Sequence, residues 1–375
     1  MWLVVGTLAA LGYTYLGYPA LIGLCARLRP ARAGGADPGG DLPGVSVLLP
    51  VFDGAAALPT KIDSLLALDY PAQHLEILIY CDGCRDDSEA VARAAADRPQ
   101  AAGRIRVFAE PVRRGKAAAL NRLAGEARGE RLLFTDVRQP LSPNSARALV
   151  AALRDLDVGC ATGRLVLRGG AGSGAYWRYE DWIRRQESRF RGVVGMTGAI
   201  AMMRRADFAP LPEGLILDDV WIPLRLALAG QRVRSVPAAL AHDTAFDDGR
   251  EFRRKVRTLA GNYQLFALLP ASLLPFRNPI WFETFSHKVL RLCAPWLMIA
   301  LLAATFAAAR AGDGGAAMRL LLAGQLAFYL MAVVGPRAGR LAGLSRTFVV
   351  LNAAALVGLA RFVRGRGRGR GRIDW

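Results

Sequence analysis

Apolar and polar positions follow two different periods through the first third of the chain. Short, almost continuous apolar runs predict buried strands at residues 45–53, 75–80, 105–108 and 131–135. Apolar residues at helical spacing predict helices at 58–68, at 88–96 and from 115–121 onward. Strands that alternate with helices are typical of an α/β domain with a mainly parallel sheet, which is the fold class that we expect.

Acidic residues follow three of the four predicted strands. Asp53, Asp82 and Asp136 each come at or just beyond the carboxyl end of an apolar run. In open parallel sheets the ligand binds beyond these strand ends. Three acids in equivalent places therefore indicate a ligand site, although an Asp-Gly pair such as Asp82-Gly83 is also typical of a simple turn.

Two adjacent acids, Asp218 and Asp219, follow the apolar run 215–217 and begin a predicted helix that ends at Gly230. Acids in this position often cap free N–H groups and complement the helix dipole. On these residues alone a cap is the simpler interpretation. The strand-end acids upstream and the arginines downstream favour a catalytic role for one member of the pair.

Long apolar segments flank the predicted α/β domain. Residues 2–26 carry no charge and are about one bilayer long, which predicts a membrane anchor. Residues 347–360 are short for a span, so an interfacial position competes with a spanning one. The predicted organisation is an anchor at 1–26, a linker at 27–43, a cytosolic domain at 44–267, an interfacial segment at 268–288, two or three membrane helices at 289–363 and a basic Gly-Arg tail at 364–375.

The net charge of +18 bears only on the orientation of the chain in the membrane. Arginines gather beside the ends of the apolar segments, which indicates a multi-pass protein of the inner (plasma) membrane with its catalytic domain in the cytosol. The chain lacks a basic helix with interleaved aromatics, so we do not expect nucleic acid as a partner. Cys81 and Cys84 have metal-ligand spacing, but no second pair accompanies them, and structural zinc is not expected.

Seven motifs together resemble one family. There is no G-x-G-x-x-G after the first strand and no complete P-loop, which argues against dinucleotide oxidoreductases and P-loop enzymes. Over residues 42–300 the chain resembles membrane-bound family 2 glycosyltransferases, similar to cellulose, chitin, hyaluronan and poly-N-acetylglucosamine synthases. The motifs that carry this resemblance are 45–53, 75–87, 115–121, 132–136, 195–205, 218–230 and 254–258.

The resemblance implies a glycosyltransferase A fold, an inverting reaction and a role for each motif. Asp219 is the implied general base, supported by Asp218. Nucleotide and donor binding falls to the strand-end acids and to three cations that face the diphosphate: Asp53, Asp82, Asp136, Lys116, Arg254 and Arg257. The loop at Thr197 and Gly198 lies on the acceptor side, and Asp136 is the implied ligand of Mg²⁺ or Mn²⁺.

Two positions depart from the family pattern. The Asp-x-Asp motif reads Asp136-Val137-Arg138, so the second acid is replaced by a cation. Metal dependence through Asp136 is favoured, with partial substitution of metal charge by Arg138 as the alternative. The aromatic residue expected near Arg257 is replaced by Thr258, which argues against long-chain processive synthesis.

These observations lead to a stated function and a rival. We expect transfer of a sugar from a nucleotide sugar, with a UDP-sugar favoured, to a hydroxyl of a cell-envelope glycan or lipid-linked acceptor. The lipid bilayer is a necessary partner, and homo-oligomers or export partners are compatible with the pattern. The rival is a degenerate transferase that binds nucleotide as the scaffold of a polysaccharide export complex.

Residues 176–191 are predicted to form an amphipathic helix that packs on the core.

Overall fold

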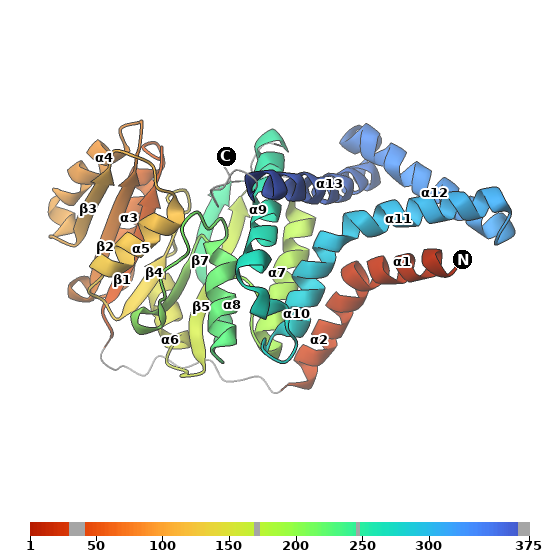
Figure 1. Cartoon of the computed structure of the whole chain (residues 1–375). Helices are drawn as coiled ribbons and strands as arrows, with labels where there is room; N and C mark the ends of the chain where they lie inside the picture. The colour runs from red at the N-terminus through yellow and green to blue at the C-terminus, as the bar shows by residue number, and fades with distance from the viewer. Residues whose placement is uncertain (30–41, 169–172, 245–247, 367–375) are drawn as a thin grey trace.

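A computed structural model describes residues 1–29, 42–168, 173–244 and 248–366. An α/β domain and a group of long apolar helices form its two parts (Figure 1). Most of the predicted linker and most of the Gly-Arg tail lie outside the described residues.

One seven-stranded sheet runs through the α/β domain. Its strand order is β3-β2-β1-β4-β6-β5-β7. Strand β6 pairs antiparallel with both β4 and β5, whereas the other pairs are parallel, so the predicted mainly parallel sheet is confirmed. The strands are β1 (Val45–Val51), β2 (Leu75–Asp82), β3 (Ile105–Glu110), β4 (Arg131–Phe134), β5 (Val158–Arg168), β6 (Ala201–Arg204) and β7 (Arg232–Thr244).

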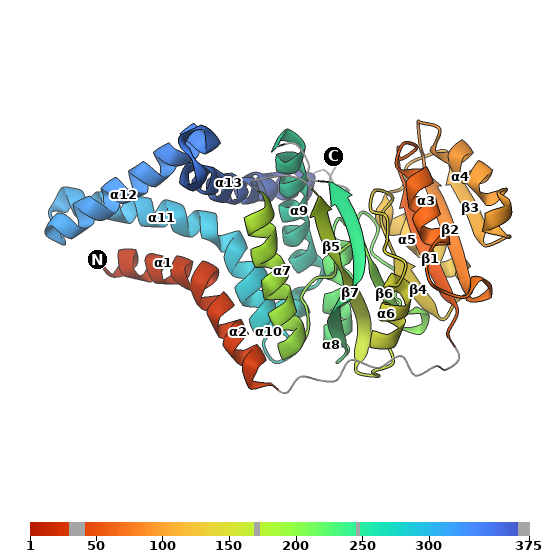
Figure 2. The same cartoon turned by 180° about the vertical axis from the view of Figure 1, so that it is seen from behind.

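Helices cover both faces of this sheet, as views from opposite sides show (Figures 1 and 2). Successive side chains of a strand point to opposite faces. In β1, Val47 and Leu49 pack with α3, α4 and α6, whereas Leu48 packs with α5 and α8 on the other face. The helices of the domain are α3 (Leu58–Leu66), α4 (Ser88–Ala96), α5 (Lys116–Glu126), α6 (Ser145–Ala152), α7 (Ser173–Phe190), α8 (Asp218–Leu228) and α9 (Asp248–Leu268).

Four helical stretches are long and apolar enough to cross a membrane. The first joins α1 (Trp2–Gly12) to α2 (Tyr18–Leu28) through a π-helical turn at Tyr13–Gly17. The second joins α10 (Trp281–Thr284) to α11 (Leu290–Ala311) through a π-helical turn at Phe285–Val289. It therefore includes the last residues of the segment predicted to be interfacial. The others contain α12 (Gly315–Val334) and α13 (Arg340–Arg366).

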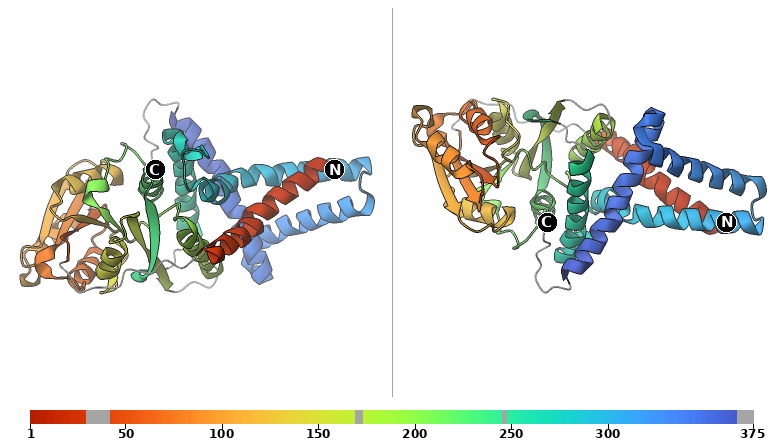
Figure 3. Two further views of the ribbon diagram at one scale, coloured as in Figure 1. Left: turned by 90° about the horizontal axis from the view of Figure 1, so that it is seen from below. Right: turned by 90° about the horizontal axis from the view of Figure 1, so that it is seen from above.

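These helices take two directions. Helices α1, α11 and α12 project away from the sheet, whereas α13 runs across them and lies against α9 (Figure 3). Tyr263 of α9 stacks on Phe362 of α13, with ring centroids 6.4 Å apart. The α13 segment thus combines the length of a span with close packing on the α/β domain.

A buried polar cluster joins the two parts of the molecule. The hydroxyl of Tyr18 donates a 2.7 Å hydrogen bond to Glu187 of α7, and His287 Nδ1 lies 2.6 Å from the same carboxylate. The second ring nitrogen of His287 lies 3.1 Å from Glu180. The two π-helical turns also meet, because the hydroxyls of Tyr13 and Ser286 are 2.8 Å apart. Buried polar groups need such partners, and these partners fix α2 and α11 against α7.

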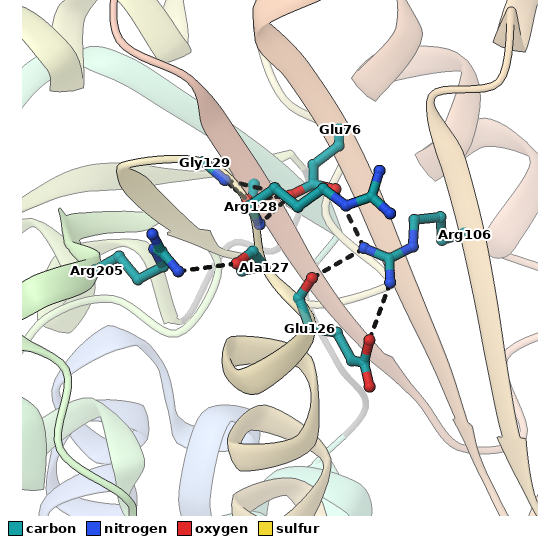
Figure 4. Close-up of polar contacts among 8 residues, drawn as sticks. Glu76, Arg106, Glu126, Ala127, Arg128, Gly129 and Arg205 are labelled. Atoms are coloured by element: carbon teal, nitrogen blue, oxygen red, sulfur yellow. Dashed lines mark hydrogen bonds and ion pairs between the residues drawn. The ribbon is translucent and has the colours of Figure 1, made fainter.

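A second polar cluster lies at the amino ends of the strands (Figure 4). One oxygen of Glu76 accepts hydrogen bonds from the backbone N–H groups of Arg128 and Gly129, at 2.6 and 3.3 Å. The guanidinium of Arg106 donates to the backbone and side chain of Glu126. The cluster holds the turn between α5 and β4, and with it the far end of the helix that begins at Lys116.

We predict that Glu76→Ala lowers the free energy of unfolding by about 1–3 kcal/mol, because the backbone N–H of Arg128 and the hydroxyl of Ser46 both lose their acceptor. The matched control is Glu89→Ala, which removes an exposed pair with Arg93 within α4 and should cost about 0.5 kcal/mol or less. Urea unfolding of the full chain in detergent measures both changes. Equal losses in the two variants would contradict this assignment.

Candidate active site

A cavity of about 1,110 Å³ opens at the carboxyl ends of the central strands and continues toward the apolar helices. It is lined both by the α/β domain and by α11, α12 and α13. Eight of the ten residues that the sequence nominates contribute to its wall. These are Lys116, Asp136, Thr197, Gly198, Asp218, Asp219, Arg254 and Arg257.

Lys116 pairs with two acids at the carboxyl ends of the central strands. Its ammonium lies 3.0 Å from Asp136, which follows β4, and 3.1 Å from Asp218 at the start of α8. Burial alone would lower the pKa of Lys116, but the two carboxylates outweigh it and raise this pKa above its ordinary value. The lysine therefore stays charged, and three distant chain segments meet at one cation.

Asp219 stands beside this pair without a cation of its own. Its Oδ1 atom is buried and has no hydrogen-bond partner among the described residues. Burial, followed by the neighbouring Asp218 carboxylate, raises the pKa of Asp219 to about 6. A carboxyl group with this pKa is mostly ionised at neutral pH yet can still accept a proton, as a general base must.

A proline ties the loop at residues 195–199 to Asp219. Pro223 lies inside α8 and has no N–H, so the carbonyl of Asp219, four residues earlier, receives no helical hydrogen bond from it. That carbonyl instead accepts a 2.8 Å bond from the N–H of Met196. The predicted base and the predicted acceptor loop are therefore joined through the backbone.

Gly198 brings the same loop against the charged pair. A Cβ atom at this position would lie 3.3 Å from Asp136 Oδ2 and 3.6 Å from the Lys116 ammonium. Thr197 is buried, and its N–H donates a 2.8 Å bond to the hydroxyl of Thr162. Glycine therefore allows the backbone to approach the acids closely.

Asp82 and Asp53 do not line this cavity. The buried carboxylate of Asp82 accepts 2.7 Å bonds from the N–H groups of Arg114 and Gly115, and so positions the start of α5. Asp53, at φ +46°, pairs with Arg85, and these hydrogen bonds lower the pKa of its carboxyl. Their predicted contacts with a nucleotide stay predictions.

Arg138 does not face the two acids at Lys116. Its guanidinium pairs with buried Asp243, which also accepts a 2.6 Å bond from Gln139. Since Arg138 is not among the residues that line the cavity, it is poorly placed to replace the charge of a metal. The position of Arg138 two residues after Asp136 does not predict its pairing with Asp243, because Asp243 belongs to β7.

Lys61 is a supporting residue that the sequence reasoning missed. It is fully buried, and its ammonium donates to Thr135 and to the carbonyl of Gln139, on either side of Asp136. Burial lowers the pKa of Lys61 to about 7. Its spacing along the sequence could have identified it as buried, because Lys61 lies three residues after Leu58 on the apolar face of α3.

An aromatic residue with two cations was missed as well. The guanidinium of Arg113 lies 3.8 Å from the ring centroid of Phe52, and that of Arg85 lies 5.2 Å from it. Arg113 also lowers the pKa of Arg257, after the larger effect of burial, so this group lies close to the cavity. Planar cations and aromatic rings are typical surfaces for a nucleobase.

The donor set suits a divalent cation that takes most of its ligands from elsewhere. Among the described residues there is no cluster of three or more His, Cys, Asp or Glu side chains that could hold a metal. Asp136 is partly exposed in the cavity, and its Oδ2 faces Gly198 rather than Lys116. Mg²⁺ commonly uses one or two carboxylates together with substrate phosphates and water. Asp136 fits that role.

Comparison with known proteins agrees with the fold. The α/β architecture and the acids beyond β4 and at α8 define a glycosyltransferase A fold. Residues 46–211 match the family described as "Glycosyl transferase family 2".

Two curated relatives and one solved structure extend the comparison. N-acetylglucosaminyltransferases of Rhizobium meliloti (strain 1021) and Rhizobium leguminosarum bv. viciae are 29% and 25% identical over 57% and 62% of this chain. The matches span 54% and 59% of those proteins. The mannosyltransferase PcManGT from Pyrobaculum calidifontis, solved with GDP-Man and Mn²⁺, superposes with a TM-score of 0.75 at 24% identity. That match covers 96% of this chain and 99% of that one, so the shared fold includes the apolar helices.

We predict that Gly198→Ala weakens binding of UDP or GDP in the presence of Mn²⁺ by about threefold to tenfold, because the added methyl group displaces the Asp136–Lys116 pair. Gly195→Ala is the matched control, since its Cβ would meet only ordinary contacts at 3.5 Å. Isothermal titration calorimetry measures both affinities. A larger loss in the control than in Gly198→Ala would refute this reading of the loop.

Proposed function

We propose that the protein is an inverting glycosyltransferase that moves a sugar from a nucleotide sugar to a hydroxyl group of a membrane-associated acceptor. The observation that carries this proposal is the placement of Asp219. It has an unpartnered buried oxygen and a raised pKa, and it lies beside a lysine-bound pair of acids in a cavity that reaches the apolar helices. The family 2 segment supports the same reaction class.

The reaction is a single displacement. Asp219 takes the proton of the acceptor hydroxyl while the acceptor oxygen attacks the anomeric carbon. The bond between that carbon and the diphosphate oxygen breaks, and the nucleoside diphosphate leaves with the electron pair. Because attack and departure occur on opposite faces, the configuration at the anomeric carbon inverts.

The leaving diphosphate needs positive charge. Lys116 and Arg257 line the donor end of the cavity and supply it. A divalent cation, Mg²⁺ or Mn²⁺, held by Asp136 would offset further charge on the leaving group. Asp82, through its bonds to the N–H groups of Arg114 and Gly115, keeps the start of α5 and therefore Lys116 in place.

The identity of the sugar follows from similarity rather than geometry. Because the curated relatives are named N-acetylglucosaminyltransferases, UDP-N-acetylglucosamine is the first donor to test. GDP-mannose is the second, since PcManGT was solved with it. We propose that the catalytic domain lies in the cytosol, where both donors are available, and that the helices lie in the inner membrane.

Replacing Asp219 by asparagine should lower sugar transfer by about 10²–10⁴-fold, because the amide cannot accept the hydroxyl proton. Binding of the nucleoside diphosphate should change far less. Transfer of radiolabelled sugar to lipid and glycan fractions of native membranes, together with nucleotide release, measures the effect. Asp97→Asn, at an exposed position on the end of α4, serves as control; similar activity in Asp219→Asn and wild type would rule out the base.

The pH dependence provides a second test of the same carboxylate. Asp219 acts in its ionised form, so the fraction of active enzyme rises with pH. We expect kcat/KM to fall tenfold per pH unit below about pH 6, the value to which burial raises the pKa of Asp219. A pH–rate profile in detergent measures this limb. A profile that is flat down to pH 4 would exclude Asp219 as the titrating base.

Removal of the metal tests the role of Asp136. EDTA should abolish transfer, and Mn²⁺ or Mg²⁺ should restore it, because Lys116 and Arg257 alone leave the diphosphate undercompensated. Titration of each metal into the chelated enzyme, with nucleotide release as the readout, decides which is preferred. Full activity in EDTA would show that the protein cations suffice. Nucleotide binding without turnover for any donor or membrane acceptor would favour the scaffold function instead.

A further inference from the structure

The cavity extends well beyond the groups that the donor requires. From Asp219 it continues between α7, α11, α12 and α13. Its far wall is largely apolar, with Phe328 and Met331 from α12 and Leu344, Phe348 and Leu351 from α13. A soluble sugar acceptor has no use for such a wall, whereas a hydrocarbon chain is stabilised by it.

Two further cations line the same cavity and lie near the base. Arg184 comes from α7, and Lys288 comes from the π-helical turn between α10 and α11. Both lie near enough to Asp219 for their charges to oppose the rise of its pKa. They are carried by elements other than those that carry Lys116 and Arg257.

The carboxylates whose charges act on Lys288 are Glu180, Asp219 and Glu187, and the two glutamates are shared with other groups. Glu180 and Glu187 are already bound by His287, and Glu180 also by Arg291. Asp181 is paired with Arg164 and with another arginine of α7. Arg184 and Lys288 have no hydrogen-bond or ion-pair partner in the part of the chain that the structure describes.

Arg184 and Lys288 are half-buried, and neither has a nitrogen atom that is both buried and without a partner. An anion that enters the cavity can therefore reach both cations. A phosphate between a guanidinium and an ammonium satisfies both. The donor diphosphate is served by Lys116 and Arg257 on the other side of Asp219. An anion bound at Arg184 and Lys288 would therefore come from the acceptor.

We propose, on the basis of the function proposed above, that the acceptor is a membrane lipid with a phosphate-linked headgroup. Its phosphate binds between Arg184 and Lys288, its chain occupies the apolar wall of α12 and α13, and a headgroup hydroxyl faces Asp219. The step balances as written above: the hydroxyl proton goes to Asp219, the new glycosidic bond forms, and the nucleoside diphosphate leaves. The same chemistry is offered by a glycerophospholipid and by a polyprenyl diphosphate sugar.

The test uses the full-length protein in nanodiscs of phosphatidylcholine, whose headgroup carries no hydroxyl. Phosphatidylglycerol, a polyprenyl diphosphate sugar and a neutral alkyl glucoside are added separately, with radiolabelled UDP-N-acetylglucosamine or GDP-mannose and Mn²⁺. Transfer to one of the two phosphate-bearing lipids, and little to the glucoside, is expected. The arm that is labelled identifies the source of the phosphate.

Variants connect the result to the two cations. Arg184→Gln and Lys288→Gln should each raise KM for the lipid about tenfold or more, as for loss of a hydrogen bond to a charged group, with a smaller change in KM for the donor. Arg184→Lys keeps the charge and should restore part of the affinity. Arg178→Gln, at an exposed position on α7 outside the cavity lining, is the matched control.

Three outcomes would overturn the inference. Equal transfer to the neutral glucoside, with unchanged acceptor KM in both glutamine variants, would show that the protein does not recognise a phosphate on the acceptor. Nucleotide release without transfer to any lipid would retain the transferase but reject a lipid acceptor. Absence of both release and transfer would reject the proposed function itself, and this inference with it.

Discussion

The geometry of the site depends on the pairing of Lys116 with Asp136 and Asp218. Three acids converge at one point of the domain, and like charges so close together repel each other unless a cation lies between them. Lys116 neutralises two of the three. The third, Asp219, keeps an unpartnered oxygen, and burial, followed by the Asp218 carboxylate, raises its pKa. The arrangement that holds the site together is thus also the one that leaves a base available.

Residues next to these three side chains support the pairing. Asp82 fixes the start of the helix that carries the lysine, and Lys61 holds the backbone on both sides of Asp136. The missing helical hydrogen bond at Pro223 frees the Asp219 carbonyl to hold the loop at Met196. None of these three residues needs to contact a substrate to position those that do.

The parallel half of the sheet could be predicted from the sequence because its strands are buried on both faces and read as continuous apolar runs. Strand β7 could not, since it contains Pro237 and a charged start at Arg232 and Arg234. The site acids were predicted from their places at strand and helix ends. Their partners were not, because contacts such as Arg138 with Asp243 join segments whose spacing in sequence carries no periodic signal.

Helix α7 illustrates the same limit. Its amphipathic pattern predicted packing on the core, and Ile183 does pack with Tyr18 and Ile22 of α2. The neighbouring Arg184 nevertheless lines the cavity. A hydrophobic pattern identifies which face of a helix is buried, but it does not distinguish a face that meets protein from one that meets a ligand.

The contact between the two π-helical turns has a mechanical consequence. Tyr13 bonds Ser286, and α2 and the turn before α11 are held to α7 through Glu187, so the apolar helices are rigidly coupled to the wall of the cavity. A hydrophobic stretch adapts to bilayer thickness by tilting. Because Lys288 belongs to one of these two turns, a change of tilt would carry the apolar helices and the wall of the cavity together. Adaptation to bilayer thickness would then reorient the whole cavity without changing its internal dimensions.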